Sequence, residues 1–104
     1  VWLPVAVAGV FVFSLRRTLM WKSGTYISYF DTAIDGGRVG PYFAGVYPAV
    51  SYDGKKGLVV VISDEGSSTI IAANWGNGWW ETDDDALLPE EVKRYIEELM
   101  YIWA

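Results

Sequence analysis

The chain has 104 residues, 52% of them hydrophobic, with no cysteine, no histidine and a formal net charge of −5. This length favours a single domain over residues 1–104, and so apolar a composition excludes an intrinsically disordered chain. The missing residue types exclude disulfides, thiolate nucleophiles and the commonest general base and metal ligand. The acidic balance argues against a nucleic-acid partner, because such proteins normally carry a basic surface. We therefore predict no enzymatic activity, no cofactor and no metal site.

The first fifteen residues carry no charge, and Arg16 and Arg17 follow them. As a helix this segment would be about 22 Å long, which is shorter than the roughly 30 Å hydrocarbon core of a bilayer. A secretory signal would place its basic residues before the apolar stretch. We therefore expect residues 1–9 to form an apolar arm that packs on its own domain or on a neighbouring copy, with a membrane anchor as the alternative. The candidate interface residues are Val5, Val7, Val10, Phe11 and Phe13.

A β-hairpin is expected around the loop Lys22–Gly24, because three-residue hairpin loops favour glycine at their last position. In residues 11–21 the odd positions are apolar except at Arg17, which is the period-two pattern of a strand. One register follows from this loop, with three facing pairs: Trp21 and Thr25, Leu19 and Ile27, Leu15 and Asp31.

Residues 35–45, with the sequence DGGRVGPYFAG, contain four glycines and one proline. Glycine and proline are the strongest local signals for a break in regular structure. This stretch is therefore predicted to be a loop or an irregular edge between two halves of the sheet.

Three apolar runs then predict an antiparallel meander with strands over 46–52, 58–63 and 68–75. The turns between them contain the aspartates and glycines that turns favour. The run Leu58–Ile62 does not alternate between apolar and polar residues, as it would in a sheet with one wet face. We therefore expect this strand to be central and covered on both faces.

The last element is a predicted amphipathic helix over residues 89–103. Its apolar residues recur at three- and four-residue steps, which places them on one stripe. Pro89 suits the first position of a helix, and Glu90 and Glu91 suit the positive end of the helix dipole. This helix can cover one face of the sheet, so the other face needs a second layer.

The stretch NWGNGWWETDDD is the most site-like part of the sequence. Its indole rings could stack on sugar rings, and its carboxylates could accept hydrogen bonds from hydroxyl groups. Packing in the core and an acidic approach to the helix are the competing interpretations. The speculative ligand-binding residues are Trp75, Trp79, Trp80, Asp83 and Asp85, and Glu81 is a further carboxylate in the same stretch.

Together these patterns predict an α+β domain: an antiparallel sheet of about five strands, mainly within residues 10–82, with one C-terminal helix packed on it. The leading functional hypothesis is a non-catalytic structural or protein-interaction subunit that forms a homo-oligomer through its apolar N-terminal segment. The alternatives are a small domain anchored in a membrane and a module with a tryptophan-lined site for carbohydrate or another small ligand. The scarcity of Asn, Gln, Cys and Met is a thermophile tendency. A cytoplasmic or virion-associated viral or archaeal protein is favoured.

Overall fold

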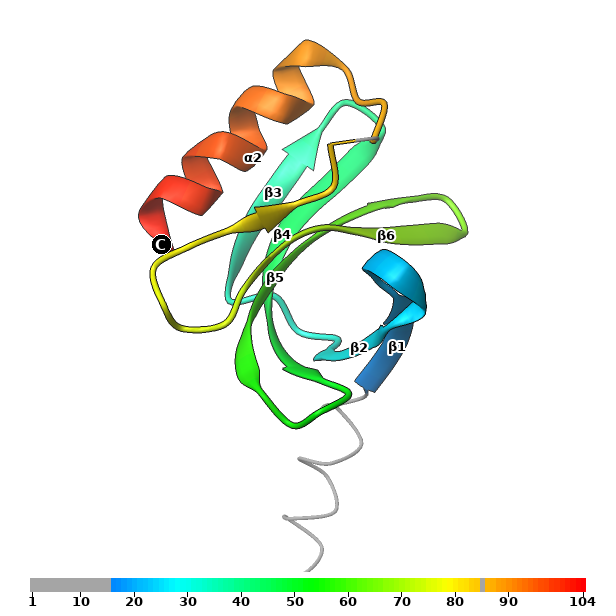
Figure 1. The fold of residues 1–104 in the computed structure, drawn as a ribbon. Coiled ribbons are helices and arrows are strands. Elements are labelled where there is room, and N and C mark those ends of the chain that lie inside the picture. Colours follow the sequence, from blue (N-terminus) through cyan, green and yellow to red (C-terminus); the bar gives the residue numbers. More distant parts are fainter. Residues whose placement is uncertain (1–15, 85) are drawn as a thin grey trace, which may run out of the picture.

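A computed structural model describes residues 16–84 and 86–104 of the chain. It is an α+β fold with one antiparallel sheet and one C-terminal helix packed on it (Figure 1). The elements in chain order are β1 (Arg16–Met20), η1 (Lys22–Gly24, a short 3-10 helix), β2 (Tyr26–Phe30), β3 (Asp35–Val39), β4 (Tyr42–Ser51), β5 (Lys56–Asp64), β6 (Ser67–Asn74), β7 (Glu81–Thr82) and α2 (Glu90–Ile102). The described sheet therefore has two more strands than the five expected, and these two, β3 and β7, lie in stretches where no strand was predicted.

The strands are paired in the order β1-β2-β4-β5-β6-β7, with β3 beside the first half of β4. The predicted meander is confirmed, because β4, β5 and β6 pair antiparallel with their sequence neighbours. The predicted first hairpin is confirmed as well: Leu19 faces Ile27, and the Trp21 N–H donates to the Thr25 carbonyl oxygen at 2.7 Å. Its third pair, Leu15 with Asp31, lies outside the described residues.

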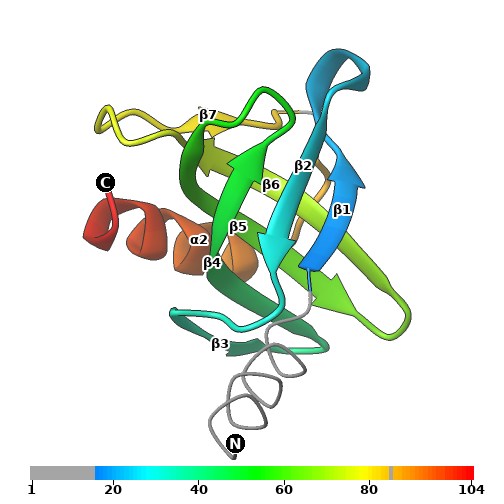
Figure 2. The same ribbon diagram turned by 90° about the horizontal axis from the view of Figure 1, so that it is seen from below.

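The central strand β5 is covered on both faces, as its sequence predicts. Val60 and Ile62 join a hydrophobic cluster under α2, which we call the helix-side cluster. Val59 and Val61 point the other way, into what we call the inner cluster. The sheet bends strongly, so that the hairpin of β1 and β2 folds over this second face (Figure 2). Among the described residues, the second layer therefore comes from the sheet itself, through side chains such as Ile27.

A β-bulge in β6 changes which side chains of this strand face the helix. Val60 faces Ala72 and Val61 faces Ile70, so Ile71 is an extra residue without a facing partner on β5. As a result, two consecutive side chains, Ile71 and Ala72, both lie in the helix-side cluster. A regular strand would have pointed them to opposite faces.

The glycine-rich stretch 35–45 is not a loop, but it does lie at an edge of the sheet, which was the other predicted form, because β3 pairs only with β4 among the described strands. It forms β3, a tight turn and the start of β4. Its glycines serve close approach between elements: a Cβ atom at Gly37 would lie 2.7 Å from the Tyr95 hydroxyl oxygen of α2. At Gly36, φ is 153° and a Cβ would lie 2.5 Å from the carbonyl oxygen of Ala44. The contact between Gly37 and Tyr95 joins residues far apart in the chain, so local sequence patterns do not reveal it.

The helix follows the prediction to within one residue at each end, with Pro89 at the N-cap position and Trp103 at the C-cap. Val92, Ile96 and Leu99 are buried on its apolar stripe. Hydrogen bonds from two indole N–H groups connect the C-terminal end of α2 to the rest of the fold. Trp103 Nε1 donates to Asp35 Oδ2 at 2.8 Å, and Trp80 Nε1 donates to the Met100 carbonyl oxygen at 2.8 Å.

Candidate functional site

The sheet does not close between β1 and β6. In the part of the chain that the structure describes, β1 pairs only with β2, and β6 pairs with β7 only at Ala72 and Ala73. The bend of the sheet nevertheless brings β1 next to β6 (Figure 2). Two strand edges therefore lie near each other without pairing, and we call the gap between them the seam.

Alternate residues of β1 direct their backbone groups toward the seam. The Trp21 N–H bonds Thr25, which makes this a hydrogen-bonded pair of the β1–β2 hairpin. Hydrogen-bonded and non-hydrogen-bonded pairs alternate along an antiparallel ladder. Every second residue backward from Trp21 therefore bonds β2, and the residues between them turn their N–H and C=O groups outward. These outward-facing residues of β1 are Arg16, Thr18 and Met20.

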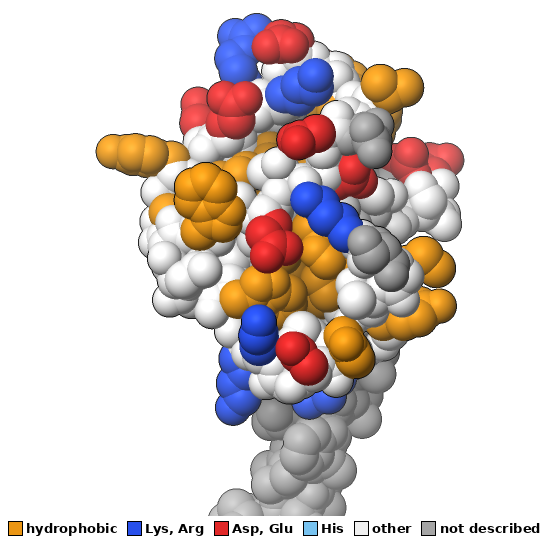
Figure 3. All heavy atoms as spheres, viewed as in Figure 1, with side chains coloured by type: hydrophobic (Ala, Val, Ile, Leu, Met, Phe, Trp, Pro, Cys, Tyr) orange, Lys and Arg blue, Asp and Glu red, His pale blue; other side chains and the backbone are white. Residues whose placement is uncertain are grey.

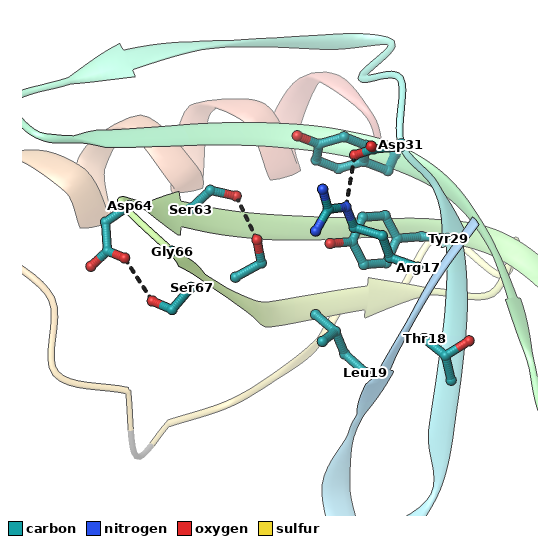
Figure 4. A pocket seen from close by; sticks show the side chains of 11 residues that line it. Arg17, Thr18, Leu19, Tyr29, Asp31, Ser63, Asp64, Gly66 and Ser67 are labelled. Atoms are coloured by element: carbon teal, nitrogen blue, oxygen red, sulfur yellow. Dashed lines mark hydrogen bonds and ion pairs between the residues drawn. The ribbon is translucent and has the colours of Figure 1, made fainter. Parts of the chain in front are cut away.

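A groove of about 620 Å³ lies between β1 and the β5–β6 hairpin (Figure 4). Tyr29 and Tyr47 form its floor, with ring centroids 5.1 Å apart and ring planes tilted by 58°. Their side chains are nearly buried, and this burial raises the pKa of both phenols above the ordinary value. Both hydroxyl groups therefore stay protonated at neutral pH and can donate hydrogen bonds.

Arg17 and Asp31 form an ion pair at the rim of the groove. Arg17 Nε lies 3.1 Å from Asp31 Oδ1, and this hydrogen bond raises the pKa of the guanidinium. The pair is exposed, so it contributes little to folding stability. The terminal nitrogens of Arg17 point away from Asp31 toward Ser63 (Figure 4). Their N–H groups are thus presented to whatever enters the groove.

Serine hydroxyls from the β5–β6 hairpin form the opposite wall. Ser63 Oγ and Ser68 Oγ are 3.1 Å apart across the hairpin, and Ser67 Oγ donates to Asp64 Oδ1 at 2.6 Å. A hydrogen bond from Ser68 also reaches Tyr29, where it opposes the effect of burial on the phenol pKa. Serine hydroxyls both donate and accept hydrogen bonds, so this wall can pair with either a donor or an acceptor group of a ligand.

The groove and the seam together suit an extended polypeptide. Outward backbone groups of β1 can pair with a strand, and the guanidinium, phenol and serine hydroxyls can donate to carbonyl oxygens beside it. Within residues 16–84 and 86–104, no group of three or more Asp or Glu side chains could hold a metal ion. Over these same ranges, no helix has both the length and the apolar character that crossing a bilayer requires.

The three tryptophans of the site-like stretch lie in different surroundings. Trp75 packs against the inner cluster, whereas Trp80 packs against the helix-side cluster and uses its indole N–H on Met100. Trp79 is 69% exposed. The structure therefore does not bring the three indoles together on one surface, and carbohydrate binding by this stretch stays a prediction.

The carboxylates of the same stretch are divided as well. Glu81 lies in β7, and the backbone N–H of Asp83 donates to the Ile71 carbonyl oxygen at 2.8 Å, which extends the β6–β7 contact. Asp83 also lines a second groove of about 560 Å³ farther along the seam. Asp85 lies outside the described residues. So do the candidate interface residues Val5, Val7, Val10, Phe11 and Phe13.

The residues that line the groove were not singled out from the sequence. One signal was present: Arg17 is the polar exception among the odd positions of 11–21, and Leu19 and Trp21 of the same series pack against the inner cluster. Tyr29 and Tyr47 carry no such mark, because an inward tyrosine in a strand is typical of ordinary core packing. Only the bend of the sheet places them under one opening.

No family model, curated protein or solved structure matches this chain.

Proposed function

We propose that this chain is a non-catalytic protein-interaction subunit that self-associates by strand pairing at the outer edge of β1. The observation that supports this most directly is the open seam, where β1 has a ladder partner on one side only among the described residues. An unpaired strand edge is a template for a further strand.

The partner that we propose is the apolar N-terminal segment of a second copy, within residues 1–13. This segment is uncharged and rich in valine and phenylalanine, residues that favour strands. Every copy carries both the segment and the β1 edge, so the interaction needs no other protein. Pairing would cover side chains at the seam such as Met20, which is 62% exposed.

The charge at this edge is compatible with such a partner. Arg17 is neutralised in part by Asp31, and Arg16 lies 5.1 Å from the centroid of the Phe30 ring. Because residues 1–13 carry no charged side chain, they are not repelled by Arg16 and Arg17 of β1. The described part of the face shown in Figure 3 also carries acidic, basic and hydrophobic side chains in a mixture, without one uniform basic area of the kind that nucleic acids need.

The oligomeric state tests the proposal. We expect light scattering coupled to size-exclusion chromatography to show an oligomer for the full chain and a monomer for a variant without residues 1–9. Thr18→Pro should also give a monomer, because it removes an N–H that faces the seam and leaves the backbone hydrogen bonds between β1 and β2 in place. It also removes the hydrogen bond between the Thr18 and Ser28 hydroxyls, which Thr18→Ala removes equally. Thr18→Ala is the matched control, since it keeps the N–H and should remain oligomeric.

Two outcomes would refute this function. A monomeric full chain would remove self-association altogether. An oligomer that survives Thr18→Pro would show that association does not use the edge of β1. Sedimentation with lipid vesicles distinguishes self-association from membrane anchoring. A full chain that requires detergent and partitions into the vesicles would favour the membrane anchor.

A further inference from the structure

The two asparagines of the chain, Asn74 and Asn77, make the same local hydrogen bond. Asn74 Oδ1 accepts the Gly76 N–H at 2.9 Å, and Asn77 Oδ1 accepts the Trp79 N–H at 3.1 Å. Each side chain thus folds back over the backbone two residues further on, in a turn that asparagine commonly makes. The surroundings of the two asparagines, however, are different.

Asn74 is buried and its backbone is closely packed. It is the last residue of β6 and is 4% exposed. At Gly57 of β5, a Cβ atom would lie 2.1 Å from the Asn74 carbonyl oxygen and 2.9 Å from Trp75 Cα. The peptide bond between Asn74 and Trp75 therefore has little room to rotate, and water has little access to the Asn74 side chain.

Asn77 lies in the exposed loop between β6 and β7 and is followed by Gly78. Gly78 has a φ of 76°, and a Cβ atom built there would have no other atom within 4 Å. Among the described residues, none accepts a hydrogen bond from the Gly78 N–H. The Gly78 amide nitrogen is therefore uncrowded and exposed to water, directly beside the side-chain amide of Asn77.

We propose that Asn77 is a site of spontaneous deamidation, whereas Asn74 is not. The Gly78 amide nitrogen loses its proton to hydroxide from the solvent and attacks Asn77 Cγ. A cyclic succinimide forms, and the side-chain nitrogen takes a proton from water and leaves as ammonia. Solvent water then opens the ring at either of its carbonyl carbons, which gives aspartate or isoaspartate. The Trp79 N–H donates to Oδ1 and stabilises the negative charge that develops on this oxygen during the attack.

The product differs from Asn77 in both charge and covalent structure. Either product adds one negative charge to the exposed loop, and isoaspartate also lengthens the backbone by one carbon atom. The modified loop joins Trp75, which packs against the inner cluster, to Trp80, which bonds α2. This inference is independent of self-association, because the loop includes neither the edge of β1 nor residues 1–13.

The test is incubation of the full chain at mildly alkaline and mildly acidic pH, followed by mass spectrometry of chymotryptic peptides. Cleavage after Trp75 separates the two asparagines. We expect a mass increase of about 1 Da in the peptide that contains Asn77 and none in the peptide that contains Asn74. The increase should be faster at alkaline pH, because the amide nitrogen attacks only after it has lost its proton.

Gly78→Ala provides the variant, because its methyl group crowds the attacking nitrogen and should slow the reaction at Asn77 by about tenfold or more. Gly76→Ala is the matched control: Gly76 also has a positive φ, 89°, and open surroundings, but it does not supply the attacking nitrogen. It should leave the rate at Asn77 unchanged.

The comparison of the two asparagines uses the unaltered chain, so it stands even if Gly78→Ala fails to fold. No mass increase at Asn77, an equal rate at Asn74, or a rate that does not rise with pH would each overturn the proposal. An unchanged rate in a folded Gly78→Ala would do the same.

Discussion

Truncating two adjacent valines of β5 tests whether both faces of the sheet are truly covered. Val59 and Val60 are both fully buried, but Val60 faces α2 and Val59 faces the β1–β2 hairpin. Each Val→Ala change removes two methyl groups, which is about 1.6 kcal/mol of transfer free energy at about 0.8 kcal/mol per group. The cavity left behind raises the expected loss in the free energy of unfolding to about 2–3 kcal/mol for each variant.

The assay is equilibrium urea unfolding of the full chain, followed by tryptophan fluorescence. Ile102→Ala is the control, because Ile102 is 63% exposed and its truncation should change the free energy of unfolding by less than about 0.5 kcal/mol. The reasoning fails if Val60→Ala shows the full loss while Val59→Ala behaves like the control. That result would mean that the β1–β2 hairpin does not exclude water from the inner cluster.

Three further predictions concern single contacts. Trp103→Phe removes the hydrogen bond to Asp35 and should lower the free energy of unfolding by about 1–3 kcal/mol, measured by urea unfolding; no change would show that this bond does not hold α2. Gly37→Ala should lower the thermal midpoint, because its Cβ would crowd the Tyr95 hydroxyl, and adding Tyr95→Phe should restore most of the loss. Burial raises the pKa of Tyr29, so the unfolded chain loses this proton at a lower pH than the folded chain does. The free energy of unfolding should therefore fall as the pH rises above about 10, and Tyr29→Phe should reduce that fall in unfolding curves measured from pH 9 to 11; an equal fall in both proteins would contradict this assignment.

Local patterns were sufficient for the elements whose side chains follow a simple period. The helix was predictable because Val92, Ile96 and Leu99 repeat at helical spacing, and this spacing exists before any packing does. The first hairpin was predictable because Gly24, with φ of 77°, meets a requirement of the loop itself. The central position of β5 was predictable because an apolar strand without alternation needs cover on both faces.

The strand β3 was not predictable in the same way, because its glycines look like a loop until their neighbours in space are known. Gly36 and Gly37 are required by Ala44 and by Tyr95, and the latter is more than fifty positions away in the chain. β7 was missed for a related reason: two residues form it only because β6 offers Ala72 and Ala73 as partners. Glycine-rich and very short strands have too little local signal to be recognised alone.

The sequence by itself determined the class of the fold, the helix, the meander and the need for two hydrophobic layers, because each depends on the spacing of apolar residues along the chain. Only the tertiary structure decided where binding could occur. The bend of the sheet opens the seam beside β1 and places Tyr29 and Tyr47 beneath Arg17. Curvature of a sheet is the sum of many small twists, a bulge and long-range packing, so no short stretch of sequence contains it.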